Sequence, residues 1–527
     1  MTREQDANPL ESPAANGAQC LALCVWLPLG ANEFHTDGDM KLNTSSLLIQ
    51  MCLWLLGSSL QISAQVPAEV KDEAYKLVGA VYTGPSMETL RELSDGFGGR
   101  LSGSPAHKRA AEWAAGKFRS FGIKNVRLEL FTMPNGWQRC GARGQMVAPL
   151  ARPLHLESLG WVPSTPEGGV KGEVILIDDV SADAIKKKAD QIKGKIVMID
   201  AAKIFAEGWQ KVLAMVDAAP QHLKDVGALA VIMPDHQANN VIGAFSMDWG
   251  GHESVLPIAQ LGMEDSELVR RLLEKGPVTV QFELHNITSG PMQVNDVIAE
   301  IRGSELPDEW IIIGAHLDSW DFGTGAEDNG AGSASVIEVA RSIAALGKAP
   351  RRSIRFALWG GEEEGLLGSS AYVQAHLNEI NKCVAVLNND NGPGHPKGWK
   401  VEGRNDLKET MQPISDELLK DIGGGGLSLE TTYDTDHGPF MLQGVPALDL
   451  WVDMKPYWDL HHKSADTYDK VDPVDFKAGS AILVATAWAI AEAPKPIAAH
   501  LDHAAVGEIL KKAGLDQLLT DMGQWKP

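Results

Sequence analysis

Residues 310–318 have the sequence Trp-Ile-Ile-Ile-Gly-Ala-His-Leu-Asp, an apolar run that ends in an imidazole and a carboxylate. A run that is apolar at every position is typical of a central parallel strand, because both faces of such a strand are covered. Further strands are expected at 354–358, 383–387 and 447–451, and helices at 336–343, 366–375 and 476–491. This alternation predicts an α/β fold with a doubly wound, mostly parallel sheet.

Metal-type side chains follow the ends of these strands. They are His316 and Asp318 after the first strand, Asp328 at the mouth of the next helix, Glu362 and Glu363 after the second strand, Asp390 after the third, and His462 toward the C-terminus. We expect them to converge, because functional sites of doubly wound sheets lie at the carboxyl ends of the strands. Each motif alone has a structural explanation, such as a hydrogen-bonded His-x-Asp pair or a solvated glutamate run. Their occurrence at successive strand ends favours a site.

The residue types in this set suit zinc. Zinc accepts imidazole and carboxylate ligands and keeps a position open in catalytic sites. One aspartate can bridge two ions about 3.5–4 Å apart. Two adjacent glutamates can divide the work, so that one binds metal and the other acts as general base toward a metal-activated water. The sequence therefore predicts metal-assisted hydrolysis.

The charge of the chain agrees with a metal site and excludes several classes of function. The 527 residues include 47 Lys+Arg and 69 Asp+Glu, a net charge of −22, which repels phosphate backbones and argues against a nucleic-acid partner. The glycine-rich stretch 323–332 lacks both the GxGxxG spacing and the Lys-Ser/Thr of a phosphate-binding loop. Hydrophobic residues make up 44% and charged residues 22%, which is typical of a globular protein.

The N-terminal region resembles a secretory signal. Met40-Lys41 precedes the apolar stretch 47–60, and Ala64 is a small residue at a plausible cleavage site. Residues 1–64 are therefore interpreted as an upstream extension and signal, the alternative being a buried N-terminal helix. Removal of residues 1–64 leaves two of the five cysteines, Cys140 and Cys383. They are expected to be unpaired core thiols, although one bridge between them is an open alternative.

The remainder of the chain divides into four segments. Residues 65–150 are predicted to form the first part of the main domain, and 289–495 its larger part. Between them, 151–288 carry short β-rich runs and are interpreted as an inserted, mostly β domain. Residues 496–527 are expected to be a C-terminal tail. Beyond the N-terminal region no apolar stretch reaches the length of a membrane span, so no stable span is expected after removal of the signal.

The motifs resemble those of the co-catalytic dizinc exopeptidases. The resemblance rests on His316-Leu317-Asp318, Asp328-Asn329-Gly330, Glu362-Glu363, Asp390, and His462 with Asp466-Thr467. It extends to Asp436-His437-Gly438-Pro439-Phe440, which is similar to the pocket loop of that family, and to Gly99-Arg100-Leu101-Ser102-Gly103-Ser104. The inserted segment resembles a protease-associated domain through Gly194-Lys195-Ile196-Val197 and Leu256-Pro257-Ile258-Ala259.

The resemblance implies a role for each residue. One zinc ion would be held by His316 and Asp390, a second by Glu363 and His462, and Asp328 would bridge them. Glu362 would be the general base and Asp318 would orient His316. Asp466 would act similarly near His462. His462 is preferred over His461 because the family spaces its ligand four residues before the aspartate.

The predicted function is hydrolysis of short peptides or dipeptides by a secreted or periplasmic exopeptidase with two zinc ions per chain. The sequence does not decide whether the enzyme removes residues from the N-terminus of a peptide, from its C-terminus, or cleaves dipeptides alone. The resemblance makes a homodimer plausible. Two alternatives use the same fold. A non-catalytic, receptor-like binding protein should have lost ligands or the base, and a glutaminyl-cyclase-like acyltransferase should hold a single zinc ion.

Overall fold

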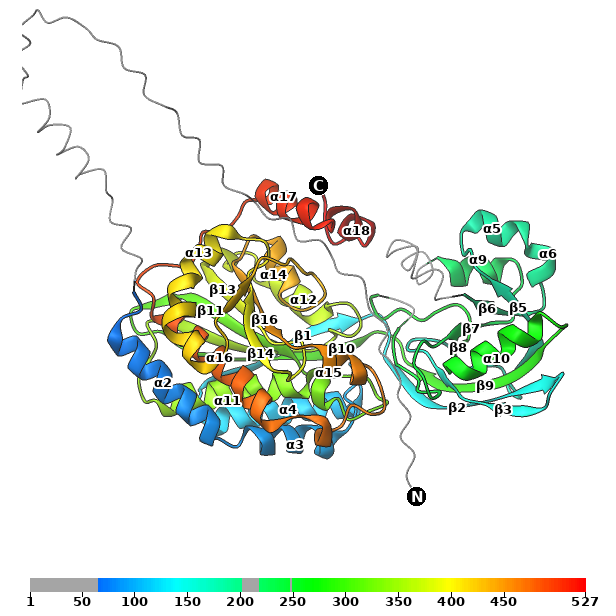
Figure 1. Ribbon diagram of the computed structural model, residues 1–527, viewed down its shortest axis with the longest axis horizontal. Coiled ribbons are helices and arrows are strands. Elements are labelled where there is room, and N and C mark those ends of the chain that lie inside the picture. Colours follow the sequence, from blue (N-terminus) through cyan, green and yellow to red (C-terminus); the bar gives the residue numbers. More distant parts are fainter. Residues whose placement is uncertain (1–64, 201–217, 247–248) are drawn as a thin grey trace, which may run out of the picture. The chain divides into compact units, whose positions relative to one another are not determined.

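The computed structural model describes residues 65–200, 218–246 and 249–527. The predicted signal, with Cys20, Cys24 and Cys52, lies outside the described residues. Within them the strands form two eight-stranded sheets (Figure 1).

The first sheet carries the strand ends singled out by the sequence. Its order is β1 (Asn125–Met133), β10 (Met292–Ile301), β12 (Arg352–Trp359), β11 (Leu306–His316), β13 (Cys383–Asn388), β16 (Ala447–Val452), β14 (Pro396–Lys400) and β15 (Gly426–Ser428). The central strands β12, β11, β13 and β16 are parallel, whereas β1–β10, β10–β12 and β14–β16 are antiparallel. The predicted α/β class is confirmed, with a mixed sheet whose parallel part lies at its centre.

Strand β11 shows why the apolar run has no polar face. Ile311 and Ile313 are buried in the core on one side of the sheet, and Trp310 and Ile312 in the core on the other side. The first side is covered by α2 (Ala68–Thr83), α4 (Pro105–Ser120), α11 (Ala331–Ala345), α13 (Asn405–Ile414) and α16 (Pro473–Glu492). The second side is covered by α12 (Leu367–Ala375), α14 (Gly438–Leu442), α17 (His503–Ala513) and α18 (Asp516–Asp521). Side chains that alternate across a strand therefore meet helices in both directions.

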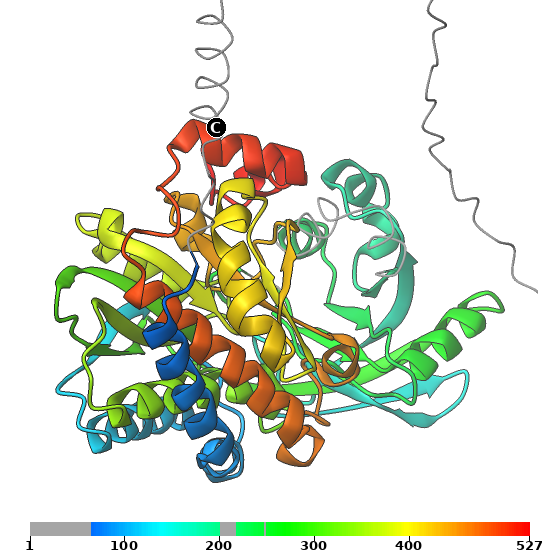
Figure 2. The same ribbon diagram turned by 60° about the vertical axis from the view of Figure 1, so that its left-hand side comes forward.

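Helix α16 is apolar around its whole circumference. Among the described residues it is the one helix with the length and hydropathy of a membrane span, but 83% of its apolar window is buried inside the protein. It runs beside α2 and contacts α11 (Figure 2). Asp472 caps its start by accepting hydrogen bonds from the backbone N–H groups of Val474 and Asp475. A helix that is hydrophobic all round is expected in the core of a large protein.

The second sheet begins earlier than the sequence suggested. Its order is β3 (Arg152–Leu154), β2 (Trp137–Ala148), β9 (Thr279–Thr288), β5 (Val170–Ile177), β6 (Ile196–Ile199), β7 (Ala230–Pro234), β8 (Ile258–Leu261) and β4 (Leu156–Ser158). β2 was expected in the first part of the main domain, yet it pairs antiparallel with β9. Helices α5 (Ala182–Lys187), α6 (Ala189–Ile192), α9 (Ala219–Asp225) and α10 (Met263–Leu273) accompany this sheet. Its assignment to the protease-associated class stays a prediction.

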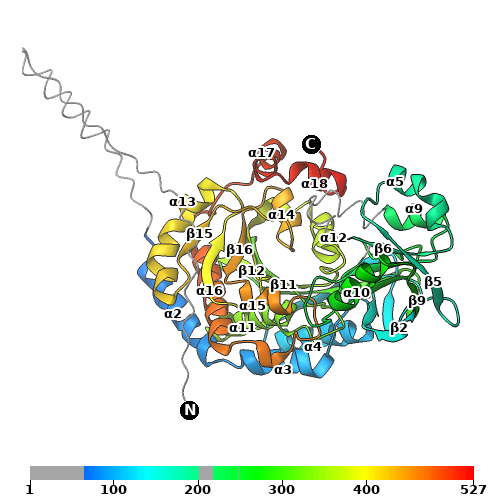
Figure 3. The ribbon, with the colours of Figure 1, turned by 45° about the vertical axis from the view of Figure 1, so that its right-hand side comes forward.

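The C-terminal segment is folded rather than a simple tail. Leu510, Leu519 and Trp525 are buried in the core that contains Phe440 of α14; α17 contacts α14, and α18 contacts α17 (Figure 3). The remaining helical elements are α3 (Ser86–Phe97), α15 (Lys455–Leu460), η1 (Ala326–Gly330), η2 (Ile380–Lys382), η3 (Ser415–Leu419), η4 (Lys420–Ile422) and η5 (Tyr468–Lys470). Cys140 and Cys383 are unpaired as expected, but Cys140 is exposed and not a core thiol.

Candidate metal centre

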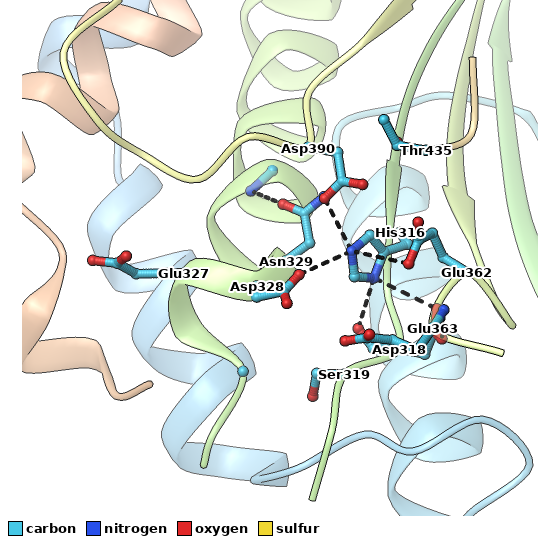
Figure 4. Close-up of polar contacts among 12 residues, drawn as sticks. His316, Asp318, Ser319, Glu327, Asp328, Asn329, Glu362, Glu363, Asp390 and Thr435 are labelled. Atoms are coloured by element: carbon cyan, nitrogen blue, oxygen red, sulfur yellow. Dashed lines mark hydrogen bonds and ion pairs between the residues drawn. The ribbon is translucent and has the colours of Figure 1, made fainter. Parts of the chain in front are cut away.

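The imidazole of His316 lies at the carboxyl end of β11 and faces carboxylates from three other segments. Its Nε2 lies 3.0 Å from Oδ1 of Asp390, after β13, and 3.2 Å from Oδ1 of Asp328. Oε2 of Glu362, after β12, is 3.9 Å from the same nitrogen. Figure 4 shows these carboxylates pointing toward the imidazole. The convergence expected from parallel strand ends is present in the structure.

A second group shares Asp328. Nε2 of His462 lies 3.3 Å from Oδ2 of Asp328 and 3.0 Å from Oε2 of Glu363. Asp328 therefore directs one oxygen toward His316 and the other toward His462. His461 also approaches Asp328, at 3.7 Å, and stacks on His462 with 3.6 Å between ring centroids. Glu363 contacts His462, but His461, His462 and Asp328 together could hold a metal ion, so the choice of His462 as the ligand stays a prediction.

The donor set fits a pair of cations. Oε1 of Glu363 and Oδ2 of Asp328 are buried and have no hydrogen-bond partner among the described residues. Four carboxylates (Asp328, Glu362, Glu363 and Asp390) gather around two imidazoles, which leaves an excess of negative charge; Asp328 and His316 are buried and the others are half-buried. Because charge removed from water is unfavourable without a counter-charge, this set of side chains could hold cations.

The ionisation of the site in the absence of metal supports this conclusion. Burial raises the pKa of Glu362 and of Glu363 well above the usual value. Burial opposes the charged form of His316, but the carboxylates of Asp390 and Glu362 outweigh it and hold the pKa of His316 well above its ordinary value. The metal-free site thus compensates its negative charge with protons, and cations would replace those protons.

Asp318 and Asp466 support the two groups in different ways. Nδ1 of His316 lies 3.0 Å from the backbone oxygen of Asp318 and 3.7 Å from its Oδ1, so Asp318 is placed to orient the ring. The expectation that Asp466 acts on His462 in the same manner is wrong. Asp466 accepts hydrogen bonds from the backbone N–H groups of Ala326, Glu327 and Asp328, and so fixes the turn that carries Asp328.

Comparison with known proteins agrees with this geometry. Residues 296–487, which include the strand ends described above, match the sequence model of peptidase family M28. This part of the chain belongs to peptidase family M28. Carboxypeptidase Q of Mus musculus is 28% identical over 418 residues, covering 78% of this chain and 86% of that protein. Carboxypeptidase Q of Homo sapiens is 27% identical over 410 residues, covering 77% and 85%.

Solved structures extend the similarity to both sheets. The peptidase M28 precursor from Shewanella amazonensis SB2B has a TM-score of 0.71 and 26% identity, covering 82% of this chain and 99% of that chain. BSAP, a zinc aminopeptidase from Bacillus subtilis, shares the fold with a TM-score of 0.58 at 22% identity, covering 76% and 93%. The resemblance to an exopeptidase family seen in the motifs is therefore confirmed at the level of family M28.

The M28 site opens into a pocket of about 530 Å³. His316, Asp328, Glu362, Glu363, Asp390 and His462 all line it. The opposite walls are largely apolar and come from distant segments; they include Trp249, Leu366, Met454, Tyr457, Trp458, Leu515, Leu518, Leu519 and Met522. Trp458 lines the pocket, whereas Trp320 packs in a buried cluster with Trp161. Lys463 bonds the carbonyl oxygens of Trp458 and Asp459.

Two residues of the M28 site were not assigned a role from the sequence. Nδ2 of Asn329 donates hydrogen bonds to Oδ1 of Asp390 (2.7 Å) and to the carbonyl of Asn389 (2.9 Å), and so orients a candidate ligand. The buried guanidinium of Arg100 donates to the carbonyl oxygens of Leu317, Thr324 and Gly325. It thereby joins the end of β11 to the turn of Asp328. Both residues lie in quoted motifs, but their partners are distant in sequence and no local pattern reveals them.

Proposed function

We propose that the protein is a zinc-dependent exopeptidase that hydrolyses short peptides or dipeptides and holds two zinc ions. The observation that carries this proposal is the position of Asp328, whose two carboxylate oxygens face separate imidazole–carboxylate groups. His316 and Asp390 would hold one ion, and Glu363 and His462 the other. The names of the relatives support the class of reaction, since one is a zinc aminopeptidase and others are called carboxypeptidase Q.

When bound, the zinc ions would polarise the scissile carbonyl and lower the pKa of an attacking water. Glu362 would take the proton of that water; the position of its carboxylate, which lines the pocket beside His316, supports this role. The same carboxyl group can then protonate the leaving amine. Asp318 holds the imidazole of His316 in one orientation, and Asn329 does the same for Asp390.

The pocket favours a short substrate with an apolar part. Besides the carboxylates, the pocket is lined by leucine, methionine and aromatic side chains and by a smaller polar group that includes Thr431, Thr432 and Gln524. The apolar part of the lining suits hydrophobic side chains of the substrate. Export from the cell, inferred from residues 40–64, and a homodimer are further proposals for the same protein.

Glu362→Gln tests the proposed reaction. We expect turnover of free dipeptides to fall by about 10²–10⁴-fold while two zinc ions stay bound, because the amide cannot accept the proton. Glu73→Gln is the matched control, since Glu73 is a buried glutamate of α2 that bonds Lys348 and does not line the pocket among the described residues. Normal turnover by Glu362→Gln would refute the mechanism. If the unaltered protein binds one zinc ion per chain and catalyses acyl transfer instead of hydrolysis, the cyclase-like alternative is favoured. If the unaltered protein binds zinc but turns over no dipeptide, the receptor-like alternative is favoured.

A further inference from the structure

A short segment beside the second sheet contacts the backbone of the candidate ligand His462. The N–H of Ala244 donates a hydrogen bond of 2.7 Å to the carbonyl oxygen of His462. Gly243 forms an isolated antiparallel bridge with Lys463. Two consecutive residues of this segment therefore pair with two consecutive residues of the loop that follows α15.

The conformation of His462 calls for such support. Its φ of 61° lies in the left-handed region, which residues other than glycine adopt at a cost in free energy. Such a conformation persists where the surrounding structure determines it. The imidazole also has an aromatic neighbour, since Trp320 lies 5.9 Å away in an edge-on arrangement. The hydrogen bond from Ala244 is thus part of what holds the ring toward Asp328 and Glu363.

The segment is itself held by a buried carboxylate. Asp235 follows β7, and its exposed fraction is 4%. Its Oδ2 accepts hydrogen bonds from the N–H of Gly243 (2.8 Å) and from Nε2 of Gln260 (2.6 Å), while Oδ1 accepts one from the N–H of Gln237 (2.8 Å). Hydrogen bonds to an ionised acceptor are about twice as strong as neutral ones. Asp235 therefore closes the loop 235–243 and presents Gly243 and Ala244 to the His462 loop.

We propose that Asp235 is a positioning residue for the zinc ion held by His462 and Glu363. It acts through Gly243 and Ala244, so that the second sheet takes part in assembling the metal centre. The other zinc ion, on His316 and Asp390, depends on residues of the first sheet and of the turn at Asp328. This inference rests on the proposed function in one respect, that His462 is a zinc ligand.

The test is zinc titration of the full-length, metal-depleted protein. Asp235→Asn should weaken one of the two zinc affinities by about 10–100-fold, as loss of a supporting contact to a metal ligand does, and leave the other unchanged. In kinetics with dipeptides at limiting zinc, kcat should fall while KM stays within about twofold, because Asp235 does not line the pocket among the described residues. Cobalt(II) in place of zinc should show a changed visible spectrum for the affected ion.

Asp265→Asn is the matched control. Asp265 is also a buried carboxylate beside the second sheet, and it accepts hydrogen bonds from the N–H of His155 and from Arg152. Gln260→Leu is a gentler second variant, since it removes one donor to Asp235 and a buried amide whose Oε1 has no partner among the described residues. It should weaken the same zinc ion to a smaller extent.

Three results would overturn the proposal. They are unchanged zinc affinities in Asp235→Asn, equal weakening of both ions, and an equal effect of Asp265→Asn. If Asp235→Asn does not fold, unchanged zinc affinities in Gln260→Leu refute it. Failure of the proposed function is distinguishable, because the unaltered protein would then bind no zinc or hydrolyse no dipeptide.

Discussion

Asp466 accepts a hydrogen bond of 3.2 Å from the backbone N–H of Asp328, which lies 138 residues earlier in the chain. The same carboxylate accepts bonds from the N–H groups of Ala326 and Glu327. One buried side chain therefore determines the backbone that carries the shared candidate ligand.

Asp466→Ala should consequently lower the affinity for both zinc ions, since the binding of each would depend on Asp328. We expect a loss of at least about tenfold in each affinity, measured by titration of the metal-depleted protein. Asp472→Ala is the control, because Asp472 also accepts backbone N–H groups, at the start of α16. That variant should lose about 1 kcal/mol of stability and no zinc affinity. Selective loss of one ion in Asp466→Ala would contradict the shared role of Asp328.

Asn329→Ala should affect the other end of the site. Removal of the amide leaves Oδ1 of Asp390 without its 2.7 Å hydrogen bond, so the ion on His316 and Asp390 should bind about tenfold more weakly. The ion on His462 should be retained. Asn286→Ala, which removes an amide bonded to Ser158 and Val162 beside the second sheet, should leave both affinities unchanged.

The stability of the metal-free protein should depend on the ionisation of Asp436. Burial raises the pKa of this carboxyl to about 8 from an ordinary value of 3.8. The folded state therefore binds a proton more tightly than the unfolded state, and its stability falls as the pH rises from about 4 to about 8. Asp436→Asn removes this loss, so its free energy of unfolding should exceed that of the unaltered protein increasingly toward pH 8, by a difference on the order of a few kcal/mol. A difference independent of pH would show that Asp436 ionises normally.

Helix α18 should set the preference for apolar side chains. Leu518 of this helix lines the pocket. Leu518→Asn should reduce kcat/KM about tenfold for dipeptides with a leucine side chain and much less for those of glycine. Zinc content should not change. An equal reduction for both substrates would indicate general damage to the pocket.

The sequence predicts the central part of this protein well, for a physical reason. Strands that are buried on both faces are apolar at every position, as Ile311–Ile313 are, and their ends are therefore easy to locate. Because parallel strands deliver their ends to one edge, His316, Glu362 and Asp390 could be placed together without any knowledge of contacts.

The errors occur where contacts are long-range. β2 has alternating exposure and no signal for which sheet it joins, since that depends on pairing with β9 more than 130 residues later. The role of Asp466 depends on N–H groups of a distant turn. The C-terminal helix α17, in contrast, has a local signal in the sequence. Asp502 is a capping residue that accepts a hydrogen bond from the N–H of Ala505, and the apolar residues Val506 and Leu510 follow at helical spacing.

The position of Arg100 and of α18 has a practical consequence for gene fusions and fragments. The stretch 296–487, which matches the family, contains the candidate metal ligands. It lacks the guanidinium of Arg100, which joins Leu317 to Gly325, and the pocket residues Leu515, Leu518 and Leu519. A fragment with those limits would keep the candidate metal ligands and the general base but lose side chains that fix their positions. A segment that keeps these contacts has to reach from Arg100 to α18, beyond both limits of the family match.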